Sequence, residues 1–255
     1  MQVGISLDQL SREWNDLAEL DPMWAILSNR DKKHARWDLD DFLATGRIEI
    51  EEALEAIQAT GCPLGTQLAL DFGCGLGRLT VALRQHFDKV VGLDVSPSMI
   101  ESAQRIHQGI DGLDFVANVR GDLAVLADDS FDFVYSSKVL QHVPGPELAK
   151  TYIAEFIRVL KPGGIAHFQI PVHTGMRRFA NRRAAYVALR RLGLSPAFLY
   201  NRLGLHPMHL ISVPFSEVRS TIVVAGGRIV TTEPDSEWPL LSNPGFVFIV
   251  LKPLL

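Results

Sequence analysis

Three glycines alternate directly after a short apolar run, at Gly73, Gly75 and Gly77. The run from Leu68 to Phe72 is typical of a strand that is covered on both faces. Glycine is needed where the backbone adopts a positive φ or lies against a ligand with no Cβ between them. A helix is expected from Arg78 to Phe87, and its free N–H groups would face the loop. The stretch therefore predicts a binding site for a polar ligand.

The glycine spacing and two acidic residues narrow the choice of ligand. Dinucleotide-binding loops prefer G-x-G-x-x-G, with a pyrophosphate at the helix N-terminus, whereas this loop has G-x-G-x-G. Asp71 precedes the loop, and an acid at the tip of a strand disfavours a phosphate and favours an ammonium group. A second apolar strand, Lys89 to Asp94, also ends in an acid. Such an acid can accept hydrogen bonds from both hydroxyls of a ribose.

Helices and further strands must position these residues. Ser96-Pro97 begins a helix, with Ser as the cap and Pro at the first position. A second helix ends at Lys161-Pro162-Gly163. The remaining predicted strands are Phe115 to Val119, Ser130 to Ser137, Ile165 to Ile170, Arg228 to Glu233 and Phe246 to Leu251. The alternation of strands and helices is typical of a nucleotide-binding α/β fold.

Taken in order, these motifs resemble the class I S-adenosylmethionine-dependent methyltransferase family, in particular its methyltransferase-11/25-like small-molecule enzymes. The resemblance covers residues 66 to 171 and rests on LDFGCGLGRLT, VVGLDVSPSMI, GDLAVLADDSFDFVYSSKVLQHV and RVLKPGG. It implies a Rossmann-like seven-stranded sheet of order 3-2-1-4-5-7-6 with the last strand antiparallel. It also implies that S-adenosylmethionine binds along the C-terminal edge of the strands and leaves as S-adenosylhomocysteine.

The resemblance assigns residues to the cofactor. The three glycines would let its methionine part pass close to the backbone, and Asp71 would orient its ammonium group directly or through water. The other assignments are Asp94 for the ribose hydroxyls, Val95 and Met99 for the two sides of the adenine, Asp122 and the Leu123 N–H for its amino edge, and Ser137 beside the methionine part. Met99 would equally suit a helix core, and helix capping is the alternative role of Asp94 and Asp122.

Methyl transfer from a sulfonium is an in-line displacement, so the enzyme must hold the methyl group about 3 Å from the acceptor atom. A base is needed only if the acceptor loses a proton. His142 follows the fourth strand and is the first candidate for this base, although it could simply hold its own loop through backbone hydrogen bonds. His173, at the end of the fifth strand, is the second. No His/Asp pair has metal-ligand spacing, so no metal is expected.

Several absences restrict the acceptor. Ser136-Ser137-Lys138 stands where an Asn/Asp-Pro-Pro-aromatic motif would favour methylation of exocyclic amines in nucleic-acid bases. Neither Cys62 nor Cys74 lies where a pyrimidine C5 nucleophile belongs. The net charge of −4 gives no global case for nucleic acid. We therefore expect methyl transfer to O or N of a small-molecule metabolite. The alternatives are a tRNA or protein methyltransferase, and a non-catalytic cofactor-binding subunit.

Two additions flank the expected catalytic core. Residues 1–62 are interpreted as an N-terminal helical lid, and residues 63–255 as the methyltransferase domain with a cap insertion at 172–213. The stretch Val172 to Val213 has seven arginines and no lysine or acid, whereas residues 1–60 have thirteen acids and six Lys or Arg. Either the lid and cap attract each other, or the arginines recruit an acidic substrate or an anionic surface. A solvated helix face is the alternative for most of them.

Length and composition agree with this interpretation. The chain has 255 residues and is 47% hydrophobic, which suffices for one α/β domain with additions. Two cysteines provide no disulfide framework. We expect a cytoplasmic protein without a membrane span, because neither a signal-peptide layout nor a long apolar run is present. The sequence leaves the oligomeric state open.

Overall fold

The computed structural model describes residues 5–172, 177–235 and 245–254. Within these ranges, seven strands form one sheet in the order β3-β2-β1-β4-β5-β7-β6. The strands are β1 (Leu68–Phe72), β2 (Lys89–Asp94), β3 (Leu113–Ala117), β4 (Phe131–Ser136), β5 (Leu160–Pro171), β6 (Arg228–Pro234) and β7 (Gly245–Leu251). Strand β7 runs antiparallel to both of its neighbours, and the other pairs are parallel. The predicted strand order and orientation are confirmed.

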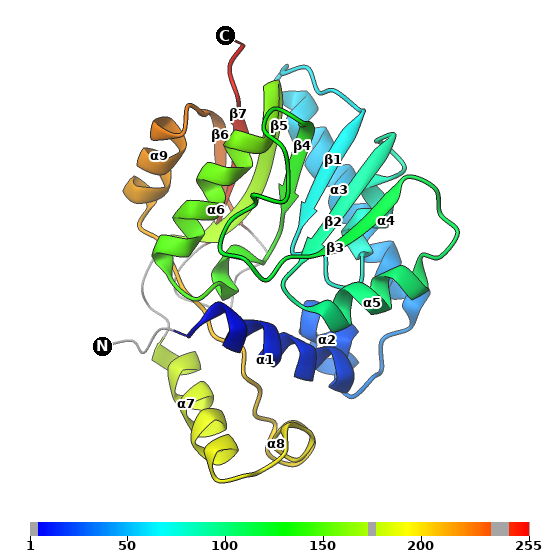
Figure 1. Cartoon of the computed structure of the whole chain (residues 1–255), viewed down its shortest axis with the longest axis vertical. Coiled ribbons are helices and arrows are strands. Elements are labelled where there is room, and N and C mark those ends of the chain that lie inside the picture. The colour runs from blue at the N-terminus through cyan, green and yellow to red at the C-terminus, as the bar shows by residue number, and fades with distance from the viewer. Residues whose placement is uncertain (1–4, 173–176, 236–244, 255) are drawn as a thin grey trace.

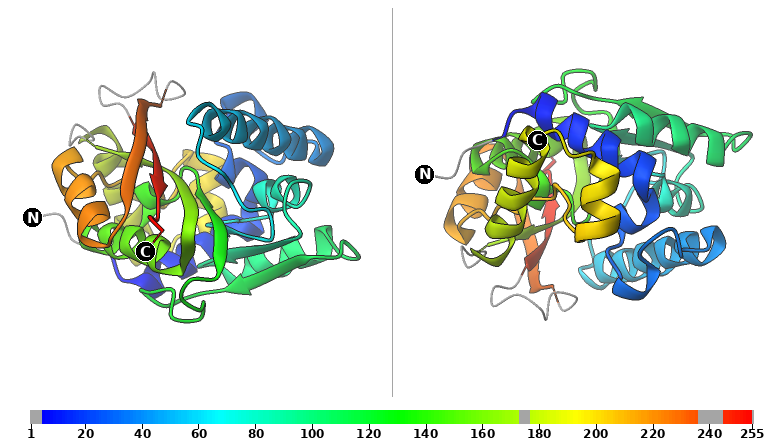
Figure 2. Two further views of the ribbon diagram at one scale, coloured as in Figure 1. Left: turned by 90° about the horizontal axis from the view of Figure 1, so that it is seen from above. Right: turned by 90° about the horizontal axis from the view of Figure 1, so that it is seen from below.

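Helices cover both faces of the sheet (Figure 2). Helices α3 (Leu39–Ala59) and α4 (Arg78–Leu83) pack on one face, and α6 (Pro146–Val159) and α9 (Phe215–Val224) on the other. Alternation along the strands divides the core: Phe133 packs towards α3 and α4, whereas its neighbour Val134 packs towards α6. Helix α5 (Pro97–Ile106) follows β2. Its N-cap is Ser96, whose hydroxyl accepts from the Met99 N–H as the capping pattern predicts.

The described part of residues 1–62 contains two kinds of segment: helices that cover one edge of the sheet, and a helix that packs in the core. Helices α1 (Leu7–Leu20) and α2 (Pro22–Ile26) lie across one edge of the sheet, and a 3₁₀ turn, η1 (Arg30–Lys32), follows them (Figure 1). Helix α3 instead belongs to the core, since Ile50 and Ile57 pack against the sheet residues Ala69 and Phe133. We therefore use the name lid for α1 and α2 alone.

The cap, residues 172–213, lies farther out than α1 (Figure 1). Its described helices are α7 (Arg177–Arg191) and α8 (Pro196–Leu203). Ser195 caps the start of α8, and Gly204 ends it at a φ of 64°. These are ordinary start and stop residues, but the helix between them has only eight residues.

Two polar contacts join the lid to the cap. The Arg183 guanidinium on α7 binds both carboxylate oxygens of Glu13 on α1, each at 2.9 Å. The Tyr200 hydroxyl on α8 donates to Asp21 Oδ2 at 2.7 Å. Opposite charge therefore does hold these two additions together, at one pair of residues rather than over a whole face. None of the helices in the described ranges is long and apolar enough to cross a membrane.

Helix α3 crosses the N-terminus of α4 at close range. A Cβ on Gly46 would lie 2.4 Å from the Arg78 carbonyl oxygen. The Arg78 side chain reaches back to α3, where it donates to Glu49 Oε2 at 2.7 Å and to Thr45 Oγ1 at 3.2 Å. Burial raises the pKa of Glu49, but the nearby Arg78 and Lys138 charges outweigh it and leave that pKa lowered. The crossing therefore depends on a small residue and a buried ion pair.

We expect Gly46→Ala to lower the free energy of unfolding by about 1–3 kcal/mol, because backbone atoms of α4 must move to admit the methyl group. This loss opposes the gain of up to about 1 kcal/mol that Ala brings inside a helix. Urea denaturation measures the difference. Gly145→Ala is the control, since its φ is −175° and a Cβ there meets nothing within 4 Å. A stabilised Gly46→Ala protein would contradict the close crossing.

Candidate active site

A cavity lies between the lid and the edge of the sheet where the parallel strands end, with about 970 Å³ of space not filled by atoms. Its floor is the glycine loop after β1 and the ends of β2 and β4, and its roof is the lid. The lining includes Gly73, Cys74, Gly75, Asp94, Val95, Met99, Asn118, Ser137, Lys138, Val139 and His142, and from the lid Leu7, Leu10, Trp14 and Ile26. We call it the donor cavity.

The glycine loop has the backbone conformation that its sequence predicts. Gly73, Gly75 and Gly77 have φ values of 81°, 53° and 79°, which L side chains rarely adopt. A Cβ on Gly75 would lie 2.6 Å from Cδ1 of Ile26, so the lid also requires a glycine there. Gly73 and Gly75 line the donor cavity, whereas Gly77 is the N-cap of α4 and faces Phe115 instead.

The Asp94 carboxylate lines the donor cavity and anchors the loop. Its Oδ2 accepts from the Gly75 N–H at 2.9 Å, and its Oδ1 accepts from the Ser96 N–H at 2.8 Å. Burial raises the pKa of Asp94, although these backbone hydrogen bonds act against the rise. Each carboxylate oxygen has a second lone pair, so both remain able to accept a hydrogen bond from a ligand hydroxyl.

Asp71 lies behind the loop and is not part of the cavity lining. Its Oδ2 accepts from the Thr80 hydroxyl at 2.6 Å, and its Oδ1 is buried with no hydrogen-bond partner among the described residues. Burial raises the pKa of Asp71 to about 7, although the Thr80 hydrogen bond lowers it. The carboxyl group is therefore about half protonated at neutral pH, with one oxygen available to a cation or a water.

The other predicted cofactor residues divide into two groups. Val95, Met99 and Ser137 line the donor cavity. Met99 is only 1% exposed and packs among core residues, so it has the helix-core role, and its contact with the adenine stays a prediction. Asp122 and Leu123 lie outside the lining, and Asn118 faces the cavity from the same connection after β3. The Leu123 N–H donates to Glu155 Oε2 at 2.9 Å rather than pointing into the cavity.

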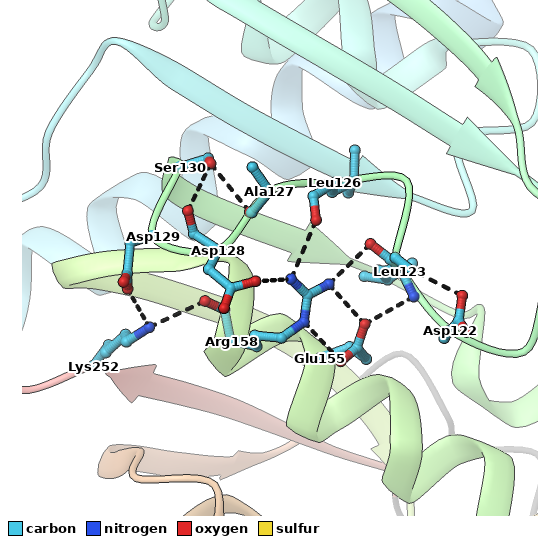
Figure 3. A network of polar contacts seen from close by, with 11 residues as sticks. Asp122, Leu123, Leu126, Ala127, Asp128, Asp129, Ser130, Glu155, Arg158 and Lys252 are labelled. Carbon is cyan, nitrogen blue, oxygen red and sulfur yellow. Dashed lines mark hydrogen bonds and ion pairs between the residues drawn. The ribbon is translucent and has the colours of Figure 1, made fainter.

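A network around Arg158 of α6 accounts for the placement of this connection (Figure 3). The Arg158 guanidinium donates to the carbonyl oxygens of Leu123 and Leu126, at 2.9 and 3.1 Å, and also binds Asp128 and Glu155. The segment from residue 123 to residue 128 is thereby drawn against α6. Arg158, which holds this segment, lies more than thirty positions away from Leu123 and Leu126 along the chain.

His142 lies in the cavity wall with both ring nitrogens engaged. Nδ1 is 2.8 Å from the His209 carbonyl oxygen, so it donates there, and Nε2 accepts from the Gln141 amide at 3.1 Å. Burial lowers the pKa of His142 to about 4, so the ring is neutral at pH 7 and a weak base. These contacts favour the interpretation in which His142 holds its own loop.

The end of the cap is fastened to the same loop by a reciprocal pair of contacts. His209 Nε2 donates to the Val143 carbonyl oxygen at 2.8 Å, while His142 donates back to the His209 carbonyl. The Ile211 N–H donates to the Gln141 carbonyl at 2.7 Å. We call these three hydrogen bonds the cap clasp. His173, the second candidate base, lies outside the described residues.

Several lining residues were not identified from the sequence. Leu10 and Trp14 recur at helical spacing in α1, and such spacing alone does not separate a core contact from a ligand contact. Tyr152 of α6 and Asn118 also reach the cavity, and no motif marks them. Of the cap arginines whose side chains are described, none lines the donor cavity. In the described part of the chain, no group of three His, Cys, Asp or Glu residues could hold a metal ion.

Residues 70–168 match the family model described as a methyltransferase domain. The glycine loop, the acid at the end of β2 and the strands β2, β3 and β4 all belong to the matched segment. Residues 70–168 therefore lie in a methyltransferase domain. The cofactor of this class of domain is S-adenosylmethionine.

Curated relatives match this methyltransferase domain over part of their length. The malonyl-[acyl-carrier protein] O-methyltransferase of Hahella chejuensis is 35% identical over 126 residues, which are 49% of this chain and 42% of that protein. The ubiquinone biosynthesis O-methyltransferase of Methylococcus capsulatus is 34% identical over 138 residues, which are 53% of this chain and 56% of that protein. The chain thus spans about half the length of the curated relatives it matches.

The fold extends beyond the matched segment. The crystal structure of magnesium protoporphyrin IX methyltransferase from Synechocystis PCC 6803 with bound S-adenosylhomocysteine superposes with a TM-score of 0.61. The alignment covers 96% of this chain and 99% of that chain at 18% sequence identity. At this identity the likeness establishes the fold of the methyltransferase domain and its additions.

We expect acid to destabilise the methyltransferase domain. Burial lowers the pKa of His142, His167, His206 and His209 to about 4, so each binds its proton less tightly when folded than the ordinary 6.5 of an unfolded histidine. Stability is therefore complete above pH 6.5 and falls as the pH drops towards 4, by up to about 1.4 kcal/mol per pH unit for each ring. Asp71 and Asp94, whose pKa values burial raises, oppose this trend.

Urea denaturation between pH 7 and pH 5 measures how the free energy of unfolding changes with pH. His206→Gln should reduce this slope by the contribution of about one bound proton. An unfolding free energy that stays level or rises towards pH 5 would contradict the burial of neutral histidines.

Proposed function

We propose that this protein transfers a methyl group from S-adenosylmethionine to an oxygen or nitrogen atom of a small molecule. The observation that carries the proposal is the donor cavity, roofed by Leu7, Leu10 and Trp14 of the lid and floored by the glycine loop. An apolar roof excludes water from a reacting sulfonium, and an enclosed volume suits a metabolite better than a polymer. The described wall has two basic residues, Arg78 and Lys138, and Arg78 is engaged by Glu49.

The residues of the donor cavity fit the cofactor. Asp94 presents two oxygens with free lone pairs for ribose hydroxyls, between Val95 and Met99 at the end of β2. Gly73 and Gly75 bring the backbone to the surface of the cavity. The unpartnered Oδ1 of Asp71 lies behind them, where an ammonium group would approach it through water. The bound cofactor supplies an electrophilic methyl group, and the chain holds that group in position and excludes water from it.

The names of the relatives agree with a small acceptor. The Hahella chejuensis relative is named for O-methylation of a malonyl group on a carrier protein, and the Methylococcus capsulatus relative for O-methylation in ubiquinone biosynthesis. We extend from them only the class of reaction. The cap clasp gives His142 a positioning role in our proposal, because it joins the loop after β4 to the segment that closes the cap.

Asp71 should make cofactor binding depend on pH. Its carboxyl has a pKa of about 7 in the ligand-free protein, and a ligand ammonium favours the ionised form. We expect the affinity for S-adenosylhomocysteine to fall about tenfold between pH 8 and pH 6, as the ionised fraction falls. Titration calorimetry measures both the affinity and the proton released. In Asp71→Asn the affinity should no longer vary over this range. If the affinity of this variant depends on pH as steeply as that of the wild type, the pH dependence belongs to another group.

Loss of Asp94 should abolish donor binding. We expect Asp94→Ala to weaken S-adenosylhomocysteine binding by at least about 100-fold, because two ribose contacts and the anchor of the glycine loop are lost together. Asp114→Ala, on the exposed side of β3, is the control. The decisive assay is production of S-adenosylhomocysteine from S-adenosylmethionine with a panel of small acceptors. An Asp94→Ala protein that binds normally would refute the assignment, and failure of the wild-type chain to bind would refute the function.

A further inference from the structure

A second cavity lies beyond the tip of β4, on the face of the sheet that α3 covers. Its described wall is made by α3, by the ends of β4 and β5, and by β6 and β7, and it contains about 910 Å³ of space not filled by atoms. Ser137 and Lys138 line both this cavity and the donor cavity, so the two meet at that loop. We call this space the rear cavity.

Buried polar atoms without partners are concentrated around the rear cavity. Both Nε2 and Oε1 of Gln169 lack a hydrogen-bond partner among the described residues, although the side chain is only 3% exposed. Ser136 Oγ and His167 Nδ1 also have none, and these residues are 0% and 8% exposed. All three residues line the rear cavity, and His167 and Gln169 lie on the same face of β5 as Ile165, which packs towards α3. Native proteins pair nearly all such atoms with protein, water or ligand, so this cluster indicates a site for a hydrogen-bonding group.

One member of the polar cluster, His167, packs against a hydrogen-bonded network. The His167 ring stacks on Tyr135, with ring centroids 5.0 Å apart, and the Tyr135 hydroxyl donates to Glu49 Oε1 at 3.2 Å. Glu49 in turn is fixed by Arg78. His167 is therefore backed by a connected network that reaches α4, the helix after the glycine loop, and Gln169 lies two residues further along the same face of β5. A preorganised set of donors and acceptors is what a specific binding site requires.

The charge of the rear cavity selects the sign of its ligand. Its described wall holds four acids, Glu49, Glu52, Glu233 and Asp235, and one base, Lys138. With His167 neutral, because burial lowers its pKa to about 4, the formal charge of the wall is −3, or −2 if the Arg78 partner of Glu49 is included. No described cap arginine lines this cavity. The field therefore attracts a cation, in contrast to the acidic acceptor that the cap arginines would recruit.

We propose that the rear cavity binds the methyl acceptor and that this acceptor is a small molecule carrying an amino group. The ammonium lies among the acids of the wall, and Gln169 and His167 bind a neighbouring polar group of the same molecule. Its methylated atom reaches the donor cavity past Ser137 and Lys138. This inference rests on the proposed function, because the rear cavity is given the acceptor only if the donor cavity holds the cofactor.

Three probes of equal chain length test the sign of the charge. Titration calorimetry and saturation-transfer NMR with 1,4-diaminobutane, 1,4-butanediol and succinate are run on the full chain with saturating S-adenosylhomocysteine. We expect the diamine to bind at least about tenfold more tightly than the diol, and succinate not to bind. Equal binding of diamine and succinate, or no binding of any probe, which would mean a water-filled cavity, overturns the proposal.

Two variants locate the binding. Gln169→Leu should weaken diamine binding by at least about tenfold while the melting temperature stays level or rises, because the replaced amide has no partner to lose. Glu52→Gln should weaken it by about threefold, whereas Glu55→Gln should not, since both acids are exposed on α3 and only Glu52 lines the cavity. Unchanged diamine affinity in Gln169→Leu overturns the location.

S-adenosylhomocysteine affinity, measured on the same samples, separates the two proposals. Normal cofactor binding without diamine binding removes only the rear-cavity inference, whereas loss of cofactor binding in the wild-type chain removes the proposed function and the inference with it.

Discussion

The Asp94 carboxylate joins the segments on which the donor half of the site depends. One oxygen holds the Gly75 N–H of the loop after β1, and the other holds the Ser96 N–H at the start of α5. The lid is attached to the same turn, since Ser11 donates to the Val95 carbonyl and Asn15 accepts from the Ser96 hydroxyl. The glycine loop and the lid are thus both anchored at the end of β2. A change at that point alters the loop, the helix and the lid together.

The two halves of the site differ in how far their polar groups are satisfied. Around the donor cavity, the Asp94 oxygens and both His142 nitrogens have partners within the chain, whereas Asp71 Oδ1 behind the glycine loop and Arg78 Nε have none among the described residues. Around the rear cavity, Gln169 has none among the described residues. A shared cofactor needs a constant cradle, whereas an acceptor must supply its own specificity through groups left open to it.

Sequence patterns predicted the features that depend on residues close together in the chain. The bounds of β1 and β2 and the glycine loop follow from apolar runs and glycines, and the family resemblance supplied the strand order. Strand β3 begins two residues before its predicted start, and β5 five residues before. His167 and Gln169 were not identified, because alternate residues of an apolar strand look like core until the opposite wall is known. The position of Leu123 depends on Arg158, a partner 35 residues away. Likewise, only tertiary packing separates α3 from the lid.

The cap clasp bears on how acceptor preference could be transplanted between related proteins. Because His209 and Ile211 are hydrogen-bonded to the loop after β4, the last residues of the insertion serve as scaffold for the catalytic core. A chimera joined at Val213 would remove that scaffold along with the insertion. A graft that ends before Met208 keeps it, so the outer helices α7 and α8 form the exchangeable module and the returning segment belongs to the recipient.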